Sequence, residues 1–136
     1  MKKNGFTLIE ILVVLGIISL LAVYLVPKLM GIQDRGKEVA VKAVAKDVQL
    51  AVEAYQMENE VFPMGQNIPL ANLVTNYLSP GGYMMTVPDN PYTGKPYQAS
   101  DGAGKIIYSY NDTTGQYTIQ AYKRNGFSKV IELGNL

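Results

Sequence analysis

The chain has 136 residues with 12 basic and 11 acidic side chains, so its formal net charge at pH 7 is +1. This length accommodates one small domain and an extended element. The scattered basic residues lack the concentrated patch typical of proteins that bind nucleic acid. The sequence contains no cysteine or histidine, which excludes disulfide bonds, thiolate chemistry and histidine sites. We therefore expect no cofactor, no metal and no nucleic acid as the main partner.

The first element is an apolar stretch over residues 6–26, in which Glu10 is the only charged residue. At a helical rise of ~1.5 Å per residue, such a helix spans roughly 30 Å, the thickness of the hydrocarbon core of a bilayer. The stretch is longer than the apolar region of a secretory signal peptide, and no small-residue cleavage site follows it. Lys2 and Lys3 precede it. The sequence therefore predicts a single-pass helix in the cytoplasmic membrane with its N-terminus inside.

Beyond Pro27 the pattern becomes amphipathic. Apolar residues recur at helical spacing between polar ones, namely Val41, Val44, Val48, Ala51, Val52 and Tyr55. This spacing predicts that one helix runs from about Phe6 to Asn59 and buries one face of its second half. Pro27 has no N–H to donate to the carbonyl four residues earlier, so it should loosen the helix, and Gly16 adds a weak point upstream.

The next region, residues 60–104, is rich in proline and glycine. We expect loops there, around one short helix that begins at or just after Pro69 and ends at Leu78. The stretch 88–97 has the composition of a turn-rich loop.

From Lys105 onward the apolar residues alternate, with Ile106, Tyr108 and Tyr110 on one face of the first segment. A period of two predicts antiparallel strands, and Asn125-Gly126 is a strong hairpin signal. The expected strands cover residues 105–111, 116–123 and 127–133. The predicted fold class is therefore α+β, with a long N-terminal helix packed on a small C-terminal antiparallel sheet.

The segment Lys2-Lys3-Asn4-Gly5-Phe6-Thr7-Leu8-Ile9-Glu10 resembles the signature of type IV prepilins and of the related pseudopilins of type II secretion systems. The resemblance extends more weakly through residues 62–63 and the loop 88–97 to the terminal hairpins. It implies a pilin-like fold with a leader peptide at 1–5, a transmembrane or filament-core helix half at 6–30 and a globular head at 31–136. The head comprises an amphipathic helix half at 31–59, a loop and short helix at 60–104 and the sheet at 105–134.

The resemblance also assigns roles to individual residues. In this family a prepilin peptidase would cut between Gly5 and Phe6 and methylate the new amine of Phe6. The glutamate that matches Glu10 meets this amine on a neighbouring subunit. Because a carboxylate inside a spanning segment costs up to about 2.5–3.5 kcal/mol, Glu10 is a functional candidate on physical grounds as well. The candidate sites are therefore Gly5 and Phe6 for processing, Glu10 and Phe6 for assembly, and Pro27 and Gly16 for helix loosening.

From the sequence we favour a structural subunit of a type IV pilus that is polymerised through its N-terminal helix into an extracellular filament. Its implied partners are other copies of itself, prepilin peptidase, an inner-membrane assembly platform and, before assembly, membrane lipid. Serines in no nucleophile motif argue against an enzyme.

Two alternatives to the pilus subunit remain. The first is a pseudopilin of a type II secretion system. Major pseudopilins typically bind calcium through an acidic C-terminal loop, whereas here that loop is basic and Asp89, Asp101 and Asp112 are dispersed. The second is an extracytoplasmic binding module that uses the N-terminal helix only as an anchor.

Overall fold

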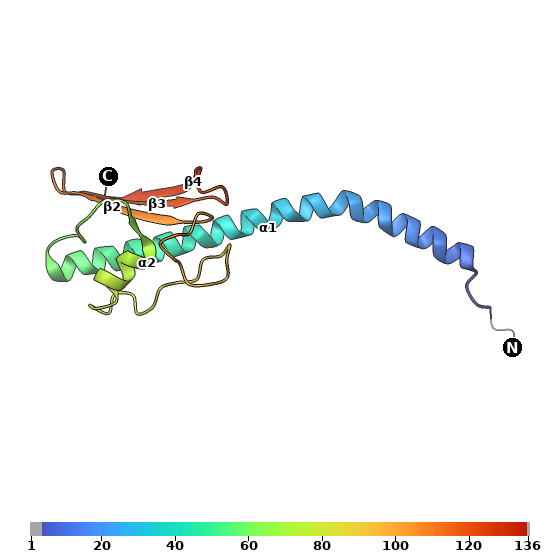
Figure 1. Ribbon diagram of the computed structural model, residues 1–136, viewed down its shortest axis with the longest axis horizontal. Helices are drawn as coiled ribbons and strands as arrows, with labels where there is room; N and C mark the ends of the chain where they lie inside the picture. The colour runs from blue at the N-terminus through green and yellow to red at the C-terminus, as the bar shows by residue number, and fades with distance from the viewer. Residues whose placement is uncertain (1–3, 136) are drawn as a thin grey trace. The chain divides into compact units, whose positions relative to one another are not determined.

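The computed structural model describes residues 4–135 (Figure 1). Lys2 and Lys3, which carry the sequence argument for membrane orientation, lie outside the described residues. The chain divides into two compact units, Met1–Arg35 and Gly36–Leu136. Each unit is described by itself below.

The first unit contains the start of helix α1 (Leu8–Asn59). Every described side chain from Asn4 to Gln33 is exposed, although most of this segment is apolar. Among the described residues, α1 is the one helix long and apolar enough to cross a membrane, judged by length and composition. The predicted single long helix is confirmed and begins at Leu8. Pro27 lies inside it, and the loosening expected at Pro27 and Gly16 stays a prediction.

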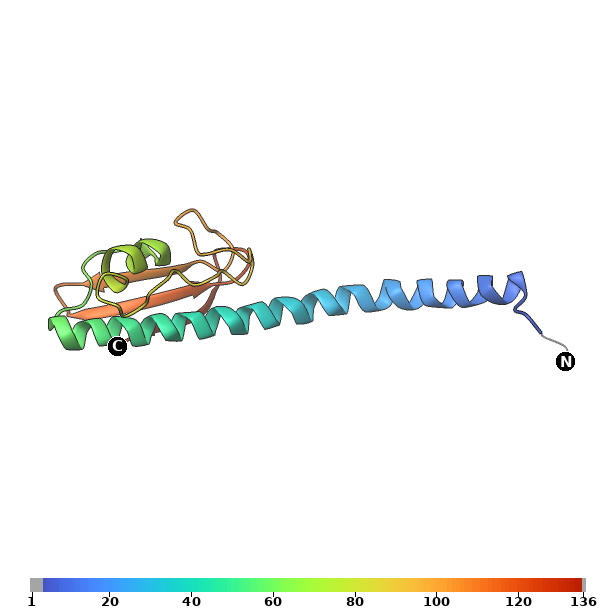
Figure 2. The same ribbon diagram turned by 90° about the horizontal axis from the view of Figure 1, so that it is seen from below.

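The second unit has its core between the later part of α1 and the sheet. This part of α1 buries one face, formed by Val41, Ala45, Val48, Ala51 and Val52. The spacing of three and four residues places these side chains on one side of the helix. Val44 and Tyr55 are partly buried against the same cluster. The amphipathic pattern read from the sequence is therefore confirmed, and Figures 1 and 2 both show the strands running alongside this part of α1.

The sheet is antiparallel throughout and has the strand order β1-β2-β3-β4. Its strands are β1 (Ile68–Pro69), β2 (Ile106–Asn111), β3 (Gln116–Tyr122) and β4 (Lys129–Gly134). Burial alternates along the two central strands, as a sheet with one covered face requires. The buried residues are Ile106 and Tyr108 in β2 and Tyr117, Ile119 and Ala121 in β3. The predicted period of two is thus confirmed.

Two details differ from the sequence prediction. The expected three-stranded sheet is wrong, because the short strand β1 adds a fourth by pairing Ile68 with Tyr108. A two-residue strand containing Pro69 shows no alternation that could reveal it, and proline tolerates only an edge position such as this one. The predicted short helix is confirmed as α2 (Leu70–Leu73), which Pro69 precedes, but it continues as the π-helical segment η1 (Val74–Leu78).

The loop 88–97 is turn-rich, as predicted, and is anchored by a buried amide. Asn90 is fully buried, and its side-chain nitrogen donates to Asp101 Oδ2 and to the carbonyl of Ala103. Its side-chain oxygen accepts the backbone N–H of Tyr92. Satisfying both ends of a buried amide lets the loop pack on the core without an unpaired polar group.

Candidate assembly site

Gly5 and Phe6 precede the first turn of α1 and are open to solvent. The side chain of Phe6 is 86% exposed. A Cβ added at Gly5 would meet no atom within 4 Å, and Gly5 does not adopt a left-handed conformation. The fold of this chain therefore does not itself require glycine at position 5. Any such requirement comes from a molecule that approaches this segment.

Glu10 takes part in a reciprocal pair of hydrogen bonds with Thr7. The backbone N–H of Thr7 donates to Glu10 Oε2 over 3.0 Å, and the N–H of Glu10 donates to Thr7 Oγ1 over 3.3 Å. This arrangement is a capping box, which satisfies two backbone donors at a helix N-terminus. Sequence reasoning identified Glu10 but missed Thr7. The Thr-x-x-Glu spacing before an apolar run was the signal that could have found it.

The Glu10 carboxylate lies in apolar surroundings. Together with Phe6, Ile9, Ile11, Val13 and Val14 it lines an open pocket. The capping bonds and the positive end of the helix dipole offset part of the cost of a charge there. Once lipid or other copies exclude water from this segment, such a carboxylate attracts a cationic partner more strongly than in water, because the local dielectric constant is then lower.

A second polar feature marks the end of the apolar stretch. Lys28 Nζ donates to the Tyr24 hydroxyl over 2.7 Å and lies 4.2 Å from the centre of the Tyr24 ring. Tyrosine and lysine are enriched where a spanning helix leaves the hydrocarbon, because each has an apolar body and a polar tip. The predicted end of the apolar stretch at residue 26 did not use this pair, and that boundary stays a prediction.

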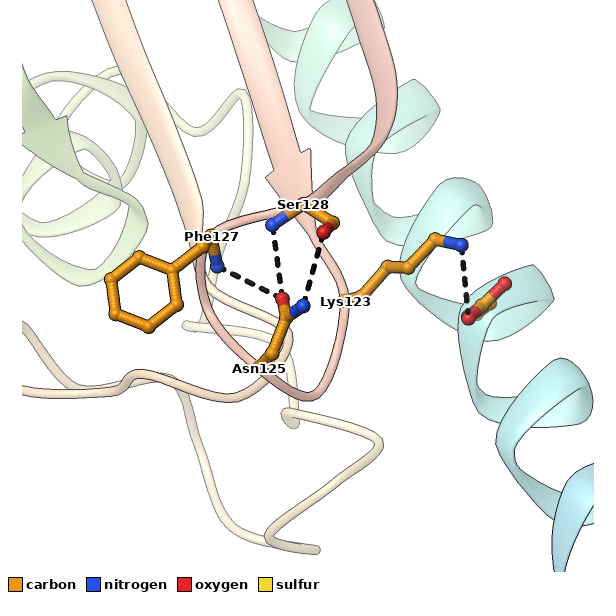
Figure 3. A network of polar contacts seen from close by, with 5 residues as sticks. Lys123, Asn125, Phe127 and Ser128 are labelled. Carbon is orange, nitrogen blue, oxygen red and sulfur yellow. Dashed lines mark hydrogen bonds and ion pairs between the residues drawn. The ribbon is translucent and has the colours of Figure 1, made fainter.

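The turn between β3 and β4 is built around Asn125 (Figure 3). Its side-chain oxygen accepts the backbone N–H groups of Phe127 and Ser128, and its nitrogen donates to Ser128 Oγ. Gly126 adopts a φ of 71°, a left-handed conformation that glycine enters without strain.

A lysine joins this turn to α1. Lys123 reaches Glu38 on the helix with 3.8 Å between Nζ and Oε1. The chemistry of the turn does not fit calcium, because its amide oxygen is already used by backbone donors and Lys123 and Arg124 place positive charge beside it. Among residues 4–135, no group of three or more acidic, histidine or cysteine side chains could hold a metal ion.

Comparison with known proteins extends these observations. Residues 1–26 match the family model described as the prokaryotic N-terminal methylation motif. The type II secretion system core protein G of Pseudomonas aeruginosa is 33% identical over 71% of this chain and 72% of its own length. The protein of the same name from Vibrio cholerae serotype O1 is 36% identical over 71% and 70%, respectively. The type IV wide pilus major component of Thermus thermophilus is 39% identical over 48% and 50%. No solved structure matches the chain.

A long N-terminal apolar helix, a methylation motif and a small head of helix and sheet define a class of structural subunits that assemble into filaments. The chain belongs to the family of type IV pilins and type II secretion pseudopilins. Members of this family are not enzymes. The family implies self-polymerisation and processing by prepilin peptidase, and the apolar helix fits a membrane-anchored subunit that is later assembled. The resemblance is thus confirmed, but the relatives do not favour a type IV pilin over a pseudopilin.

Proposed function

We propose that this chain is the repeating structural subunit of a type II secretion pseudopilus. One observation carries the proposal. Similarity to core protein G covers about seven-tenths of the chain, far beyond the methylation motif matched at residues 1–26. The similarity to the pilus component of Thermus thermophilus covers less than half of the chain.

The unprocessed subunit is first inserted in the cytoplasmic membrane. In this proposal residues 1–5 are a leader on the cytoplasmic side, residues 6–30 form the spanning half of the helix and residues 31–136 form the extracytoplasmic head. Prepilin peptidase cuts between Gly5 and Phe6 and methylates the amine of Phe6. The exposure of both residues ahead of α1 supports this step, because a peptidase needs an extended, accessible segment.

Assembly transfers the apolar helix from lipid into a bundle of like helices. Because both surroundings are apolar, the hydrophobic gain is small, and packing and polar contacts decide the outcome. Exposing the helix to water would instead cost on the order of 1.5–3 kcal/mol for each large apolar side chain. In this proposal Glu10 pairs with the Phe6 amine of a neighbouring copy. That amine is largely protonated at neutral pH, given an ordinary pKa of about 7.7–8.0.

The second candidate is the subunit of a surface type IV pilus. The turn between β3 and β4 favours it, because major pseudopilins typically bind calcium near their C-terminus and this turn does not suit calcium. Its basic side chains would repel the ion, and the Asn125 side-chain oxygen already accepts two backbone N–H groups. Either filament grows from an inner-membrane assembly platform, and both use the same N-terminal chemistry.

Substitution of Glu10 tests the shared part of the proposal. Glu10→Ala should leave membrane insertion and leader removal intact, because neither needs the carboxylate, while filament yield falls at least about tenfold, the loss expected for roughly 1.4 kcal/mol. Mass spectrometry of the N-terminus checks processing, and electron microscopy of sheared material checks yield. Asp112→Ala removes an exposed carboxylate from a turn of the second unit, outside the apolar helix, and serves as the control. A normal yield from Glu10→Ala would refute the role given to this residue.

A deletion strain separates the two filaments. A secretion defect without long surface filaments supports the pseudopilus. Long native filaments that contain this chain, together with normal secretion in the deletion strain, would overturn it in favour of the pilus.

A further inference from the structure

Phe127 is exposed at the turn between β3 and β4, on a backbone fixed by hydrogen bonds. Its side chain is 87% exposed, yet its backbone N–H donates to the Asn125 side chain over 3.0 Å. The Lys123 backbone N–H donates to the Ser128 carbonyl and closes the turn. Figure 3 shows the Phe127 ring and the Lys123 side chain leaving the turn in opposite directions, with Lys123 directed toward α1. An exposed phenyl ring on an ordered backbone loses little conformational entropy on binding.

A second group of exposed apolar side chains lies where α1 ends. Met57 is 79% and Met85 76% exposed, and Val61 and Met64 are each half exposed. We call these four residues the methionine end. The Tyr83 hydroxyl donates to Glu58 and accepts from Asn59, which places the segment carrying Met85 beside the last turn of α1. Flexible methionine side chains adapt well to an inserted apolar group.

The two groups lie at opposite ends of the second unit. Lys123 contacts Glu38, near the start of the part of α1 in this unit, whereas Met57 is close to the last residue of the helix, Asn59. At ~1.5 Å per residue, Glu38 and Met57 are roughly 28 Å apart along the helix. Figure 1 shows the β3–β4 turn and the C-terminal end of α1 at opposite ends of the sheet.

The charges around the two groups are complementary. The turn and its flanks, residues 123–129, contain three basic residues and no acidic one. The segment 57–61 contains Glu58 and Glu60 and no basic residue. Lys123 and Lys129 each have an acidic partner in the same head, but their side chains remain 46% and 45% exposed. Their ammonium groups can therefore donate further hydrogen bonds.

We propose that Phe127 of one copy docks on the methionine end of the next copy in the filament. The inference rests on the proposed function, since it requires self-assembly, and it holds for a pseudopilus or a pilus. A contact between two different surfaces of the same molecule generates an open helical polymer whenever its rotation does not close into a ring. The apolar core with opposite charges at its rim fixes the orientation of the two heads.

Cysteine crosslinking tests this contact directly, because the native chain contains no cysteine. The full-length double variant Phe127→Cys/Met57→Cys should form a ladder of disulfide-linked oligomers in sheared filaments. Each single variant should give no species beyond a dimer. Phe127→Cys/Thr113→Cys is the matched control, because Thr113 is exposed on the other turn of the sheet, between β2 and β3. We expect no ladder from this control.

The outcomes separate the contact from the function. Filaments without a ladder in the Phe127/Met57 variant, or with an equal ladder in the Thr113 control, would overturn the docking proposal and leave the filament subunit standing. Failure of the native chain to form any polymer would overturn both.

Charge reversal gives an independent readout. Glu60→Lys should lower the polymerised fraction several-fold at low ionic strength, and the deficit should shrink at high salt because screening weakens repulsion from the basic turn. Asp112→Lys puts the same charge on the β2–β3 turn, at the same end of the head but outside the proposed contact, so its deficit should be smaller. Equal assembly of both variants at low salt would count against the proposed orientation.

Discussion

Asn125 is the residue on which the geometry of the β3–β4 turn depends. Replacing it by alanine removes the acceptor for two backbone N–H groups. Because the site is exposed and water can partly replace the lost partner, Asn125→Ala should lower the free energy of unfolding by only about 1 kcal/mol. Asn125→Asp keeps an acceptor oxygen and should retain most of the stability. Urea unfolding of the full chain in detergent measures both, and an equal loss in the two variants would contradict this role.

Tyr117 links the sheet to α1 through polar contacts. Its hydroxyl donates to Glu53 Oε1 over 2.8 Å and accepts from Gln49 Nε2 over 3.2 Å. Tyr117→Phe keeps the buried ring and leaves two half-buried groups on α1 without this partner, so the free energy of unfolding should fall by about 1–2 kcal/mol.

Tyr122→Phe is the matched control for Tyr117→Phe, because the Tyr122 hydroxyl donates only to Gln120 on its own strand. Its cost in the free energy of unfolding should stay below about 0.5 kcal/mol. Equal losses from the two substitutions, measured by the same urea titration, would show that the link to α1 contributes nothing.

At the scale of the element, the first turn of α1 depends on Thr7 as well as on Glu10. Thr7→Val removes the hydroxyl that accepts the Glu10 N–H while keeping a similar shape, and a lost N-cap costs about 0.5–2 kcal/mol. The amides of the first turn should therefore exchange hydrogen about 2- to 30-fold faster, the factors that correspond to those energies. Thr7→Ser should exchange as the native chain does. Native-like exchange in Thr7→Val would disprove the cap.

The long elements could be predicted from the sequence, and the short ones could not. Helix α1 and strands β2–β4 repeat a burial pattern over enough residues for the period to be unambiguous. Strand β1 and the π-helical segment η1 are set by packing against the core rather than by any local pattern. Element boundaries shifted by at most two residues, as expected where the ends of helices and strands fray.

Some residues of the candidate sites could likewise be predicted from the sequence, and others could not. Glu10 stands out in the sequence, because a lone carboxylate in an apolar run is costly and is therefore a functional candidate. The pairing of Lys123 with Glu38 and the exposure of Phe127 could not be predicted, because they depend on how distant segments pack. The β3–β4 turn itself was predicted from Asn125-Gly126, whereas the contact proposed for it was not.

At the scale of the whole molecule, most apolar side chains fall into two groups, exposed ones in the first unit and buried ones in the head. The described side chains up to Gln33 are all exposed, so this segment depends on lipid or on other copies for an apolar environment. The head buries its own core between α1 and the sheet. Substitutions in the head core should therefore affect stability in detergent, and substitutions in the first unit should affect assembly instead.

The buried tyrosines of the head predict how its stability depends on pH. Burial, with a contribution from the hydrogen bond to Glu53, raises the pKa of Tyr117 to about 12. Burial also raises the pKa values of Tyr97 and Tyr108 well above the ordinary value. In the unfolded chain each phenol ionises near its ordinary pKa of about 10. The unfolded state therefore binds fewer protons than the folded state above about pH 10, and folding stability must fall as the pH rises through this range.

The stability that these three buried tyrosines contribute should be fully present below about pH 10. Above it the free energy of unfolding should decrease, with Tyr117 alone accounting for on the order of 2 kcal/mol between about pH 10 and pH 12. Urea titrations at a series of pH values measure the free energy, and phenolate absorbance reports the ionisation. Because Tyr97 and Tyr108 resist ionisation in the folded head, part of the absorbance should appear only together with unfolding. Stability that stays constant up to pH 12, with all ten tyrosines titrating near pH 10, would mean that these phenols are not buried as described.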